Sequence, residues 1–277
     1  MFFSEKSRNF AVLKAIRSVK IKQVLSALER FAPLPLQESW DNAGLQIGLT
    51  EAEVSGALLC LDVTEQVIDE AVAKGCNLVV SHHPLLFRGL KQVSDANDVQ
   101  RTVRKAIKHD VCVISMHTNL DNAKGGVNFK MAEKLGAMVL NDACENDSLE
   151  KVPMVVAELP EALDARQFVA HVKRCFSVEC AHCNELLQRP IKKVAICGGA
   201  ADFMLDEAIA SGADAFITGE MHYHSYFGHE QEIQICVIGH YESEQFTSEI
   251  FREIIEKACP GVACQIAETN TNPIKYY

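Results

Sequence analysis

The sequence predicts an α/β protein made of two related α/β domains, with mainly parallel sheets that face each other across a cleft. Short apolar runs alternate with segments of helical periodicity along most of the chain, and this alternation is typical of βαβ units and a parallel sheet. A polar stretch at residues 141–151 interrupts the alternation once. With 277 residues, 48% of them hydrophobic, the chain is long enough for one large domain or two small ones.

The first half shows the alternation most clearly. Apolar side chains recur at helical spacing over residues 21–31, and the prolines at positions 33 and 35 end that predicted helix. A turn-rich segment at 39–44 follows. We then expect strands at 56–61, 77–81 and 111–116, and helices at 65–74, 97–109 and 127–135.

The second half resumes the pattern after the polar stretch. Strands are expected at 152–158, 191–197, 214–218, 233–238 and 262–267, and helices at 162–176, 242–257 and in a segment that ends at residue 210. These elements predict four parts of the chain: an extension at 1–18, a first α/β domain at 19–140 with 239–277 contributing to its cleft, a linker and the start of the second half at 141–190, and a second α/β half at 191–277.

Charge and cysteine content limit the classes of binding partner and the cellular compartment that we expect for this protein. The formal net charge of −10 makes nucleic acid an unlikely partner, because such binding requires a positive surface. No stretch approaches the roughly 20 apolar residues of a membrane span, so no membrane partner is expected. Most of the eleven cysteines lie in apolar runs, which is typical of a reducing compartment, and we expect a cytoplasmic protein.

The first 20 residues are basic and poor in acids. One interpretation is a faint likeness to a mitochondrial transit peptide. The other, which we favour, is a ragged extension or a start codon placed too early.

Two adjacent histidines, His82 and His83, follow the apolar run at 78–80. Ligands gather at the carboxyl ends of strands in open α/β sheets, and neutral imidazole binds zinc, iron, nickel and copper. Consecutive strand residues point to opposite faces, so the pair can serve two neighbouring ions only where the backbone turns. The alternative is one buried and one exposed histidine without a ligand.

Five further polar residues share this position after a predicted strand, namely His117, Asp121, Glu220, His240 and Glu244. If the two halves face each other, we expect these groups to converge in the cleft. Ordinary alternatives exist, because Asp121 suits a turn and Glu244 suits a helix start. His240 and Glu244 are four residues apart and share a helix face, whereas His117 can orient a ligand without binding an ion.

Three weaker patterns each allow two interpretations. The cluster Glu220, His222, His224 and His229 is either a set of ligands or a solvated face, and Glu220, His224 and His117 are candidates for proton transfer. The Gly198–Gly199 pair either admits a phosphate or substrate close to the backbone or forms a tight turn. The third pattern consists of Cys175, Cys180, His182 and Cys183. These residues bind a metal, form a redox pair, or simply lie in a surface loop.

Five motifs in order give the chain a resemblance to a known family. They are Ser39–Gly48 (SWDNAGLQIG), Ser81–Leu85 (SHHPL), His117–Asp121 (HTNLD), Ile217–Glu220 (ITGE) and Gly239–Glu244 (GHYESE). Together they closely resemble the GTP cyclohydrolase I type 2-like, or Nif-three-like, family, from about Val19 to the C-terminus. The chain lacks the additional domain that longer relatives insert between the halves.

The resemblance implies a dinuclear metal centre in the cleft and a toroidal homohexamer. Carried over by motif, His83 and Asp121 would bind one ion, His82 and His240 the other, and Glu244 both. Mixed nitrogen and oxygen ligands suit two divalent ions of zinc, iron, manganese, nickel or cobalt. The expected function is a metal-dependent hydrolase, cyclohydrolase-like or phosphoesterase-like, on a small nucleotide-like or phosphorylated molecule. The alternative is a non-enzymatic metal-binding or metal-delivery protein, or a protein-interaction scaffold.

Overall fold

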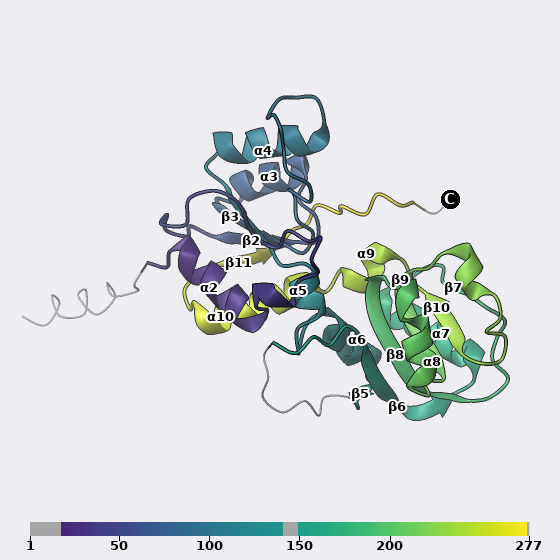
Figure 1. The fold of residues 1–277 in the computed structure, drawn as a ribbon. Coiled ribbons are helices and arrows are strands. Elements are labelled where there is room, and N and C mark those ends of the chain that lie inside the picture. Colours follow the sequence, from purple (N-terminus) through teal and green to yellow (C-terminus); the bar gives the residue numbers. More distant parts are fainter. Residues whose placement is uncertain (1–17, 141–148, 276) are drawn as a thin grey trace, which may run out of the picture.

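The computed structural model describes residues 18–140, 149–275 and 277. Residues 1–17 of the predicted extension and 141–148 of the predicted linker lie outside the described residues. The described chain forms two sheets, with the short helices α5 (Thr118–Asp121) and α9 (His240–Glu244) between them (Figure 1).

The first sheet has five strands and is mainly parallel. β4, β3, β2 and β11 run parallel, and β1 joins the β4 edge antiparallel. The strands β2, β3 and β4 are buried at every position, as expected for a parallel sheet covered on both faces. Their bounds, in sheet order, are β1 (Gly44–Ile47), β4 (Cys112–Ser115), β3 (Leu78–Ser81), β2 (Ala57–Cys60) and β11 (Cys264–Ile266).

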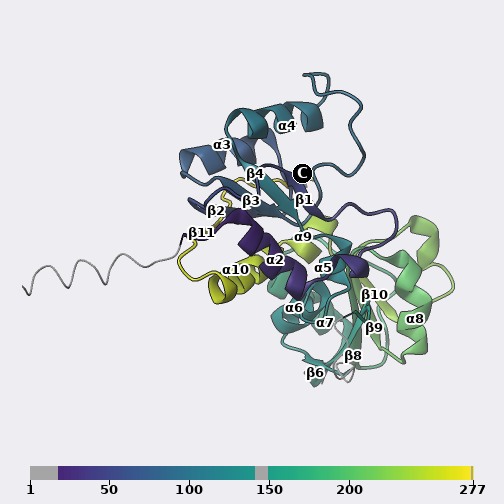
Figure 2. The same cartoon turned by 60° about the vertical axis from the view of Figure 1, so that its left-hand side comes forward.

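Helices cover both faces of this sheet. α3 (Glu65–Ala73) and α4 (Asp98–Lys108) lie on one face, and α2 (Ile21–Phe31) and α10 (Thr247–Ala258) on the other (Figure 2). α10 and β11 come from the C-terminal end of the chain, so the first sheet is completed only after the chain has passed through the second.

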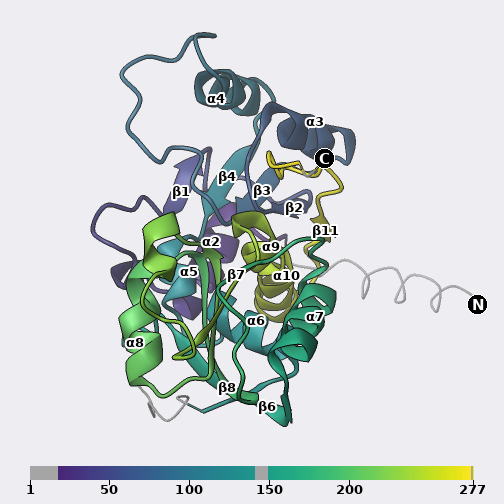
Figure 3. The same ribbon diagram turned by 90° about the vertical axis from the view of Figure 1, so that its right-hand side faces the viewer.

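The second sheet has six strands of mixed direction. β8, β9 and β10 run parallel, whereas β5, β6 and β7 pair antiparallel with their neighbours. α6 (Val127–Leu135) and α7 (Ala165–Phe176) cover one face, and α8 (Leu205–Ala210) covers the other (Figure 3). The strands, in sheet order, are β5 (Met138–Val139), β6 (Val155–Leu163), β8 (Ile191–Ala200), β9 (Ala215–Glu220), β10 (Gln234–Val237) and β7 (His182–Cys183).

One hydrophobic core joins the two sheets. It holds Leu59 and Val80 from the first sheet, Met131 from α6, and Ile196 and Ile217 from the second sheet, all buried. Because apolar contacts run without a break from one sheet to the other, packing fixes the two sheets relative to each other.

The predicted parallel strands of both halves are present, the edge strands β5 and β7 are additions to the expected elements, and several details differ from the expectation. β8 continues through Gly198 to Ala200, because Gly199 adopts φ +65° inside a register shift, which makes a bulge rather than the expected tight turn. The helix expected at 242–257 is divided into α9 and α10. β6 begins at Val155 rather than at 152.

Three 3-10 turns complete the described chain: η1 (Leu34–Leu36), η2 (Asp202–Met204) and η3 (Tyr223–Tyr226). Among the described helices, none is both long and apolar enough to cross a membrane.

Candidate metal centre

A backbone turn after β3 brings His82 and His83 to the same side. The amides of both histidines donate to the Leu61 carbonyl, at 3.1 and 3.0 Å. The hydroxyl of Ser81 donates to the His83 carbonyl at 2.9 Å, and that of Ser115 does so at 3.3 Å. The two imidazole centroids are consequently 4.9 Å apart, so adjacent residues serve one site although they follow a strand.

His117 and Asp121 reach the same place through α5. His117 caps this helix after β4, and Asp121 is its last residue. The Thr118 amide and hydroxyl both donate to Asp41, which fixes the start of α5 against the segment before β1. The His117 ring centroid lies 5.3 Å from that of His82 and 5.4 Å from that of His83.

His240 and Glu244 come from α9, the helix that follows β10. Gly239 precedes the helix with φ +101°, a conformation open to glycine but strained for other residues. His240 and Glu244 are one turn apart on one face, with Nε2 and Oε2 3.2 Å apart. The Glu244 side chain is 4% exposed, so its carboxylate is withdrawn from water.

These side chains form three overlapping groups with ligand spacing. One consists of His82, His83 and His117, and the other two share Glu244. In the first of these two, His82 Nε2 lies 3.5 Å from Asp121 Oδ1 and 3.7 Å from Glu244 Oε1. In the second, Glu244 Oε2 lies 3.0 Å from His83 Nε2 and 3.2 Å from His240 Nε2, and the two nitrogens are 3.3 Å apart. Both groups have the spacing expected of side chains that can hold a metal ion. Glu244 therefore offers one oxygen to each group.

This grouping differs from the one that the family resemblance implies. The resemblance paired His83 with Asp121 and His82 with His240. In the structure His82 is beside Asp121 and His83 is beside His240. The turn after β3 causes this, because it directs His82 toward α5 and His83 toward α9.

Each histidine of the cluster has its Nδ1 held by an acceptor. The acceptors are a backbone carbonyl in one case and carboxylates in the other three: Met116 O for His82 (2.8 Å), Asp62 for His83 (2.7 Å), Asp41 for His117 (2.8 Å) and Glu220 for His240 (3.1 Å). In a neutral imidazole, an acceptor at Nδ1 holds the proton there and leaves Nε2 as a lone pair. This is how proteins orient histidines that bind metals.

The orientation leaves buried acceptors facing one another. His82 is fully buried, and burial lowers its pKa, so its imidazole is neutral. Its Nε2 lone pair points toward the carboxylates of Asp121 and Glu244. Among the described residues, neither His82 Nε2 nor Glu244 Oε2 has a hydrogen-bond partner. Buried polar atoms normally have one, and a cation is the group that satisfies all of these acceptors together.

The electrostatics of the cluster also favour positive charge. Burial and the neighbouring Glu244 carboxylate raise the pKa of Asp121 well above its usual value. Burial alone lowers the pKa of His83, but the Asp62 and Glu244 carboxylates outweigh burial and raise it to about 10. The pKa of His240 rises to about 9, because Glu244 outweighs burial there too. Without a metal ion, the carboxylates thus favour protonation of the groups around them.

The bulge in β8 makes room for Glu244. A Cβ at position 199 would lie 2.5 Å from Glu244 Oε1 and 3.7 Å from a ring carbon of His240. The Gly198 amide donates to Asn128 in α6, and the Gly199 amide to Ser243 in α9. The double glycine thus forms a bulge rather than a tight turn, allows the backbone to approach the Glu244 carboxylate, and lines the cavity that opens onto the cluster.

A cavity of about 710 Å³ opens onto the cluster. His83, His117, Asp121, His240 and Glu244 all line it. Three exposed aromatic side chains stand around it: Trp40 and Phe87, with ring centroids 5.7 Å apart, and Phe203 from beyond β8. The described lining includes no lysine or arginine.

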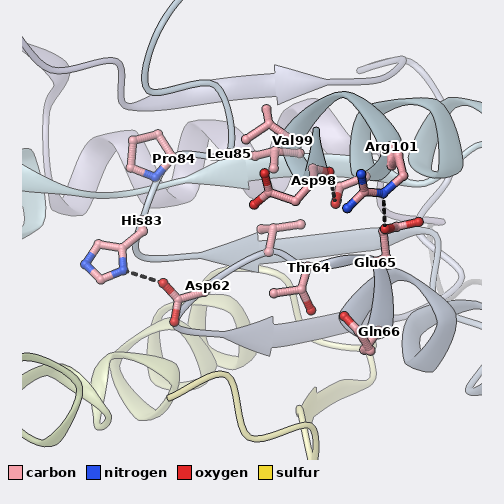
Figure 4. Close-up of a pocket in the computed structure, with 12 residues that line it drawn as sticks. Asp62, Thr64, Glu65, Gln66, His83, Pro84, Leu85, Asp98, Val99 and Arg101 are labelled. Atoms are coloured by element: carbon pink, nitrogen blue, oxygen red, sulfur yellow. Dashed lines mark hydrogen bonds and ion pairs between the residues drawn. The ribbon is translucent and has the colours of Figure 1, made fainter. Parts of the chain in front are cut away.

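A second, smaller pocket of about 310 Å³ lies beside His83. Figure 4 shows the His83 ring turned toward Asp62 at one end of this pocket, and an ion pair between Arg101 and Glu65 at the other. His83 lines both this pocket and the larger cavity, and Asp62 holds its Nδ1 on the side of the smaller pocket. The other oxygen of Asp62 accepts from the Thr271 hydroxyl at 2.7 Å.

Of the predicted proton-transfer candidates, two contact the cluster. His117 lies beside His82 and His83, and Glu220 holds His240. His224 is elsewhere, in η3, where its ring packs against Tyr223 and Phe227.

Sequence reasoning missed Asp41 and Asp62. Asp62 follows the strand predicted at 56–61, the same position that identified the other residues, so that signal was present. Asp41 lies in a turn 76 residues before His117, and only the SWDNAGLQIG motif pointed to it.

Comparison with known proteins agrees with this architecture. The sequence model of the family described as Duf34/NIF3 (NGG1p interacting factor 3) matches residues 19–273. A Clostridium acetobutylicum protein named GTP cyclohydrolase 1 type 2 homolog is 30% identical over 268 residues, which cover 94% of this chain and 99% of that protein. A Clostridium perfringens protein of the same name is 34% identical over 229 residues, covering 82% and 87%.

Solved structures show the same fold. A hypothetical protein from Staphylococcus aureus matches with a TM-score of 0.85 and 28% identity, covering 94% of this chain and 100% of that one. A Bacillus cereus protein related to NIF3 matches with a TM-score of 0.83 and 22% identity, covering 94% and 100%.

Proposed function

The chain belongs to the Duf34/NIF3 family, and from that premise we propose that it binds two divalent metal ions and acts as a metal-dependent hydrolase on a small nucleotide-like molecule. One ion would be held by His82, Asp121 and Glu244. The other would be held by His83, His240 and the second oxygen of Glu244. Zinc, iron, manganese, nickel and cobalt all suit such ligands.

The observation that carries this proposal is that two buried atoms of the cluster, His82 Nε2 and Glu244 Oε2, have no hydrogen-bond partner among the described residues. The spacing of the two groups fits as well. Two donors that are each about 2.1 Å from one ion at a tetrahedral angle lie about 3.4 Å apart. The distances from each histidine Nε2 to its neighbouring donor atoms in these groups run from 3.0 to 3.7 Å.

His117 is the residue best placed to move a proton. It lines the cavity, and Asp41 holds its Nδ1 so that Nε2 is free to accept a proton from water or to return one to a leaving group. The Asp41 carboxylate would stabilise the imidazolium that forms. When bound, the divalent ions supply Lewis acidity, which polarises a substrate oxygen and makes water more acidic.

The cavity walls favour a planar ring over a polyphosphate. Trp40 and Phe87 offer exposed aromatic faces on one side, and the backbone of Gly198–Ala201 forms a wall of small residues. Aromatic faces stack on planar rings. Polyphosphate sites normally use lysine or arginine, and the described lining has neither. A nucleobase-like ring with at most one anionic group therefore suits this cavity.

Turnover by the metal-loaded chain tests the proposal. The full chain, loaded in turn with zinc, manganese and iron(II), would be screened against nucleosides, nucleoside monophosphates, simple phosphate esters and purine-like rings. We expect hydrolysis of at least one ring-bearing compound, and a loss of at least about 100-fold in Asp121→Asn and Glu244→Gln. Glu249→Gln, on the neighbouring helix α10, is the matched control and should keep full activity. Equal turnover after chelation would exclude the proposed role of the ions.

The alternative is a protein that binds and delivers metal without catalysis. The open cavity favours it, since the His240 side chain is 31% exposed and an ion would leave along that path. This function predicts fast transfer of metal to a competing chelator and no turnover in the screen. Slow transfer with turnover supports the hydrolase instead.

We also propose, from the family resemblance, that the chain assembles as a toroidal homohexamer and resides in the cytoplasm. The ten cysteines in the described residues are all free, which supports a reducing compartment. Light scattering on the purified chain tests the assembly, since a hexamer has six times the chain mass of 30.6 kDa. Cell fractionation tests the location.

A further inference from the structure

Two cysteines face each other across the edge of the second sheet, away from the metal cluster. β7 pairs antiparallel with β10, and Cys183 lies directly opposite Cys236 in the register. Opposed residues of an antiparallel pair have Cα atoms about 4.5–5.5 Å apart, which is within the range that a disulfide spans. Both thiols are free in this structure.

The two thiols differ in exposure and in acidity. Cys236 is fully buried, whereas Cys183 is half-buried on a strand with no further strand outside it. The side-chain hydrogen bond with Cys236 lowers the pKa of Cys183, against burial, and the charge of Lys173 on α7 adds to this effect. The same hydrogen bond and burial raise the pKa of Cys236. Cys183 is thus the nucleophile of the pair, since thiolates react and thiols do not.

We propose that Cys183 and Cys236 form a reversible disulfide between β7 and β10 when the protein meets a hydroperoxide. The Cys183 thiolate attacks one peroxide oxygen, which breaks the O–O bond, gives Cys183 sulfenic acid and releases hydroxide. The Cys236 sulfur then attacks the Cys183 sulfur and expels its oxygen as water, with the Cys236 proton leaving in that water. Two thiols lose two electrons, and one peroxide becomes two waters.

This pairing resolves an ambiguity in the sequence. Cys180 and Cys183 stand three apart and invited a local metal or redox pair with each other. In the structure Cys180 is exposed just before β7, and Cys183 has its partner on β10 instead. β10 leads directly into Gly239 and His240, so the disulfide would fix the strand that precedes α9. The inference does not depend on the proposed hydrolase activity.

Disulfide mapping on the full chain tests the inference. The reduced protein, freed of reductant and kept with a chelator to suppress metal-catalysed oxidation, is treated with one equivalent of hydrogen peroxide. Remaining thiols are blocked with N-ethylmaleimide, and the chain is digested without reduction. We expect a linked peptide pair that contains Cys183 and Cys236, lost on adding dithiothreitol, and a higher Tm for the oxidised protein.

Variants separate this outcome from its competitors. Cys183→Ser should abolish the linked pair, whereas Cys180→Ser, the exposed neighbour, should form it at the wild-type rate. Cys236→Ser should leave a sulfenic acid on Cys183 that dimedone traps. Because Cys236 is buried, the Cys236→Ser variant can fail to fold. The disulfide map of the wild-type protein therefore tests the inference without that variant. A Cys180–Cys183 or Cys175–Cys183 link, or a Cys183 oxidised beyond sulfenic acid beside a free Cys236 thiol, would overturn the inference.

Discussion

At the scale of single residues, the candidate centre depends on the groups behind the histidines as much as on the histidines. Asp41, Asp62 and Glu220 each hold one Nδ1, and a backbone carbonyl holds that of His82. These acceptors set which nitrogen carries the proton and so which nitrogen is free for an ion.

Asp62→Asn tests this dependence. The amide keeps the size of the carboxylate but loses its charge, so His83 is held less firmly and is a weaker ligand. We expect metal affinity to fall about 10- to 100-fold, measured by competition with a coloured chelator. Asp69→Asn, an exposed acid of α3 that pairs with Lys105, should leave the affinity unchanged. Wild-type affinity in Asp62→Asn would show that Asp62 does not position His83.

Gly199→Ala tests the close approach of β8 to Glu244. The new methyl group would collide with Oε1 of Glu244, and we expect at least one ion per chain to be lost, measured by elemental analysis. Gly212→Ala is the matched control. Gly212 has φ +71°, so alanine there carries similar backbone strain of roughly 1 kcal/mol, but its Cβ would meet only Lys193 Nζ at 3.9 Å. Equal metal content in the two variants would contradict the steric argument.

The convergence of most residues of the candidate centre was predictable at this scale, and the reason is topological. His82, His83, Asp121 and His240 each follow an apolar strand, and sheets collect the carboxyl ends of parallel strands on one edge. Asp41 was not predictable in this way, because it follows no strand and reaches His117 only through the fold. The grouping of the candidate ligands was not predictable either, since it depends on the backbone turn after β3 rather than on spacing along the chain.

At the scale of elements, the apolar runs predicted the central strands and amphipathic periodicity predicted most helices. The errors fall where the local signal is weak. Two-residue strands such as β5 and β7 are too short to show a period, and the glycines of β8 resemble a turn although they form a bulge. The periodicity of the segment also gave no sign of the division between α9 and α10.

The Glu70 carboxylate of α3 holds the C-terminal tail after β11, beside an ion pair between Lys74 and Glu268. Glu70 accepts from the amides of Glu268 and Thr269, at 2.8 and 2.9 Å, from the Thr269 hydroxyl and from Lys74. Burial raises the pKa of Glu70, but these hydrogen bonds outweigh burial and lower it from 4.5 to about 2. The stability that Glu70 contributes is therefore full above about pH 4.5 and is lost as the pH falls toward 2.

Glu70→Gln should reduce the free energy of unfolding by about 1–3 kcal/mol at pH 7. The deficit should shrink below pH 4.5, because protonation then weakens the wild type as well. Urea unfolding at pH 7 and at pH 3.5 measures both values. Glu268→Gln, which removes only an exposed ion pair with Lys74, is expected to cost less than 1 kcal/mol. A deficit that does not change with pH would contradict the assigned role of the carboxylate.

At the scale of the whole molecule, the fold class was predictable, but the directions of the strands in the second sheet were not. Alternating strands and helices indicated βαβ units in both halves, and the first sheet follows that pattern. The second sheet contains three antiparallel pairings beside its parallel core, and strand direction leaves no mark on apolar periodicity. The predicted domain boundaries stay a prediction.

Metal binding should stabilise the whole molecule, because some of the proposed ligands follow strands of the first sheet and the others follow a strand of the second sheet. An ion that binds only the folded state at 100 times its Kd adds about 2.7 kcal/mol, which corresponds to a rise of about 5–10 °C in Tm. Differential scanning fluorimetry with zinc or manganese measures the shift. Calcium, which prefers oxygen ligands, should give a smaller one, and Glu244→Gln should remove most of it. An equal shift in Glu244→Gln would place the ion elsewhere.

The return of α10 and β11 to the first sheet has a consequence for biosynthesis. β2 obtains its outer neighbour only when residues 264–266 have left the ribosome, after the entire second sheet has been made. Until then the nascent chain presents an open strand edge beside the apolar surface that α10 will cover. The first sheet is therefore the last to be completed although its synthesis begins first. A premature stop codon shortly before β11 leaves a truncated chain with an exposed strand edge, which is prone to aggregate rather than to fold as a functional half.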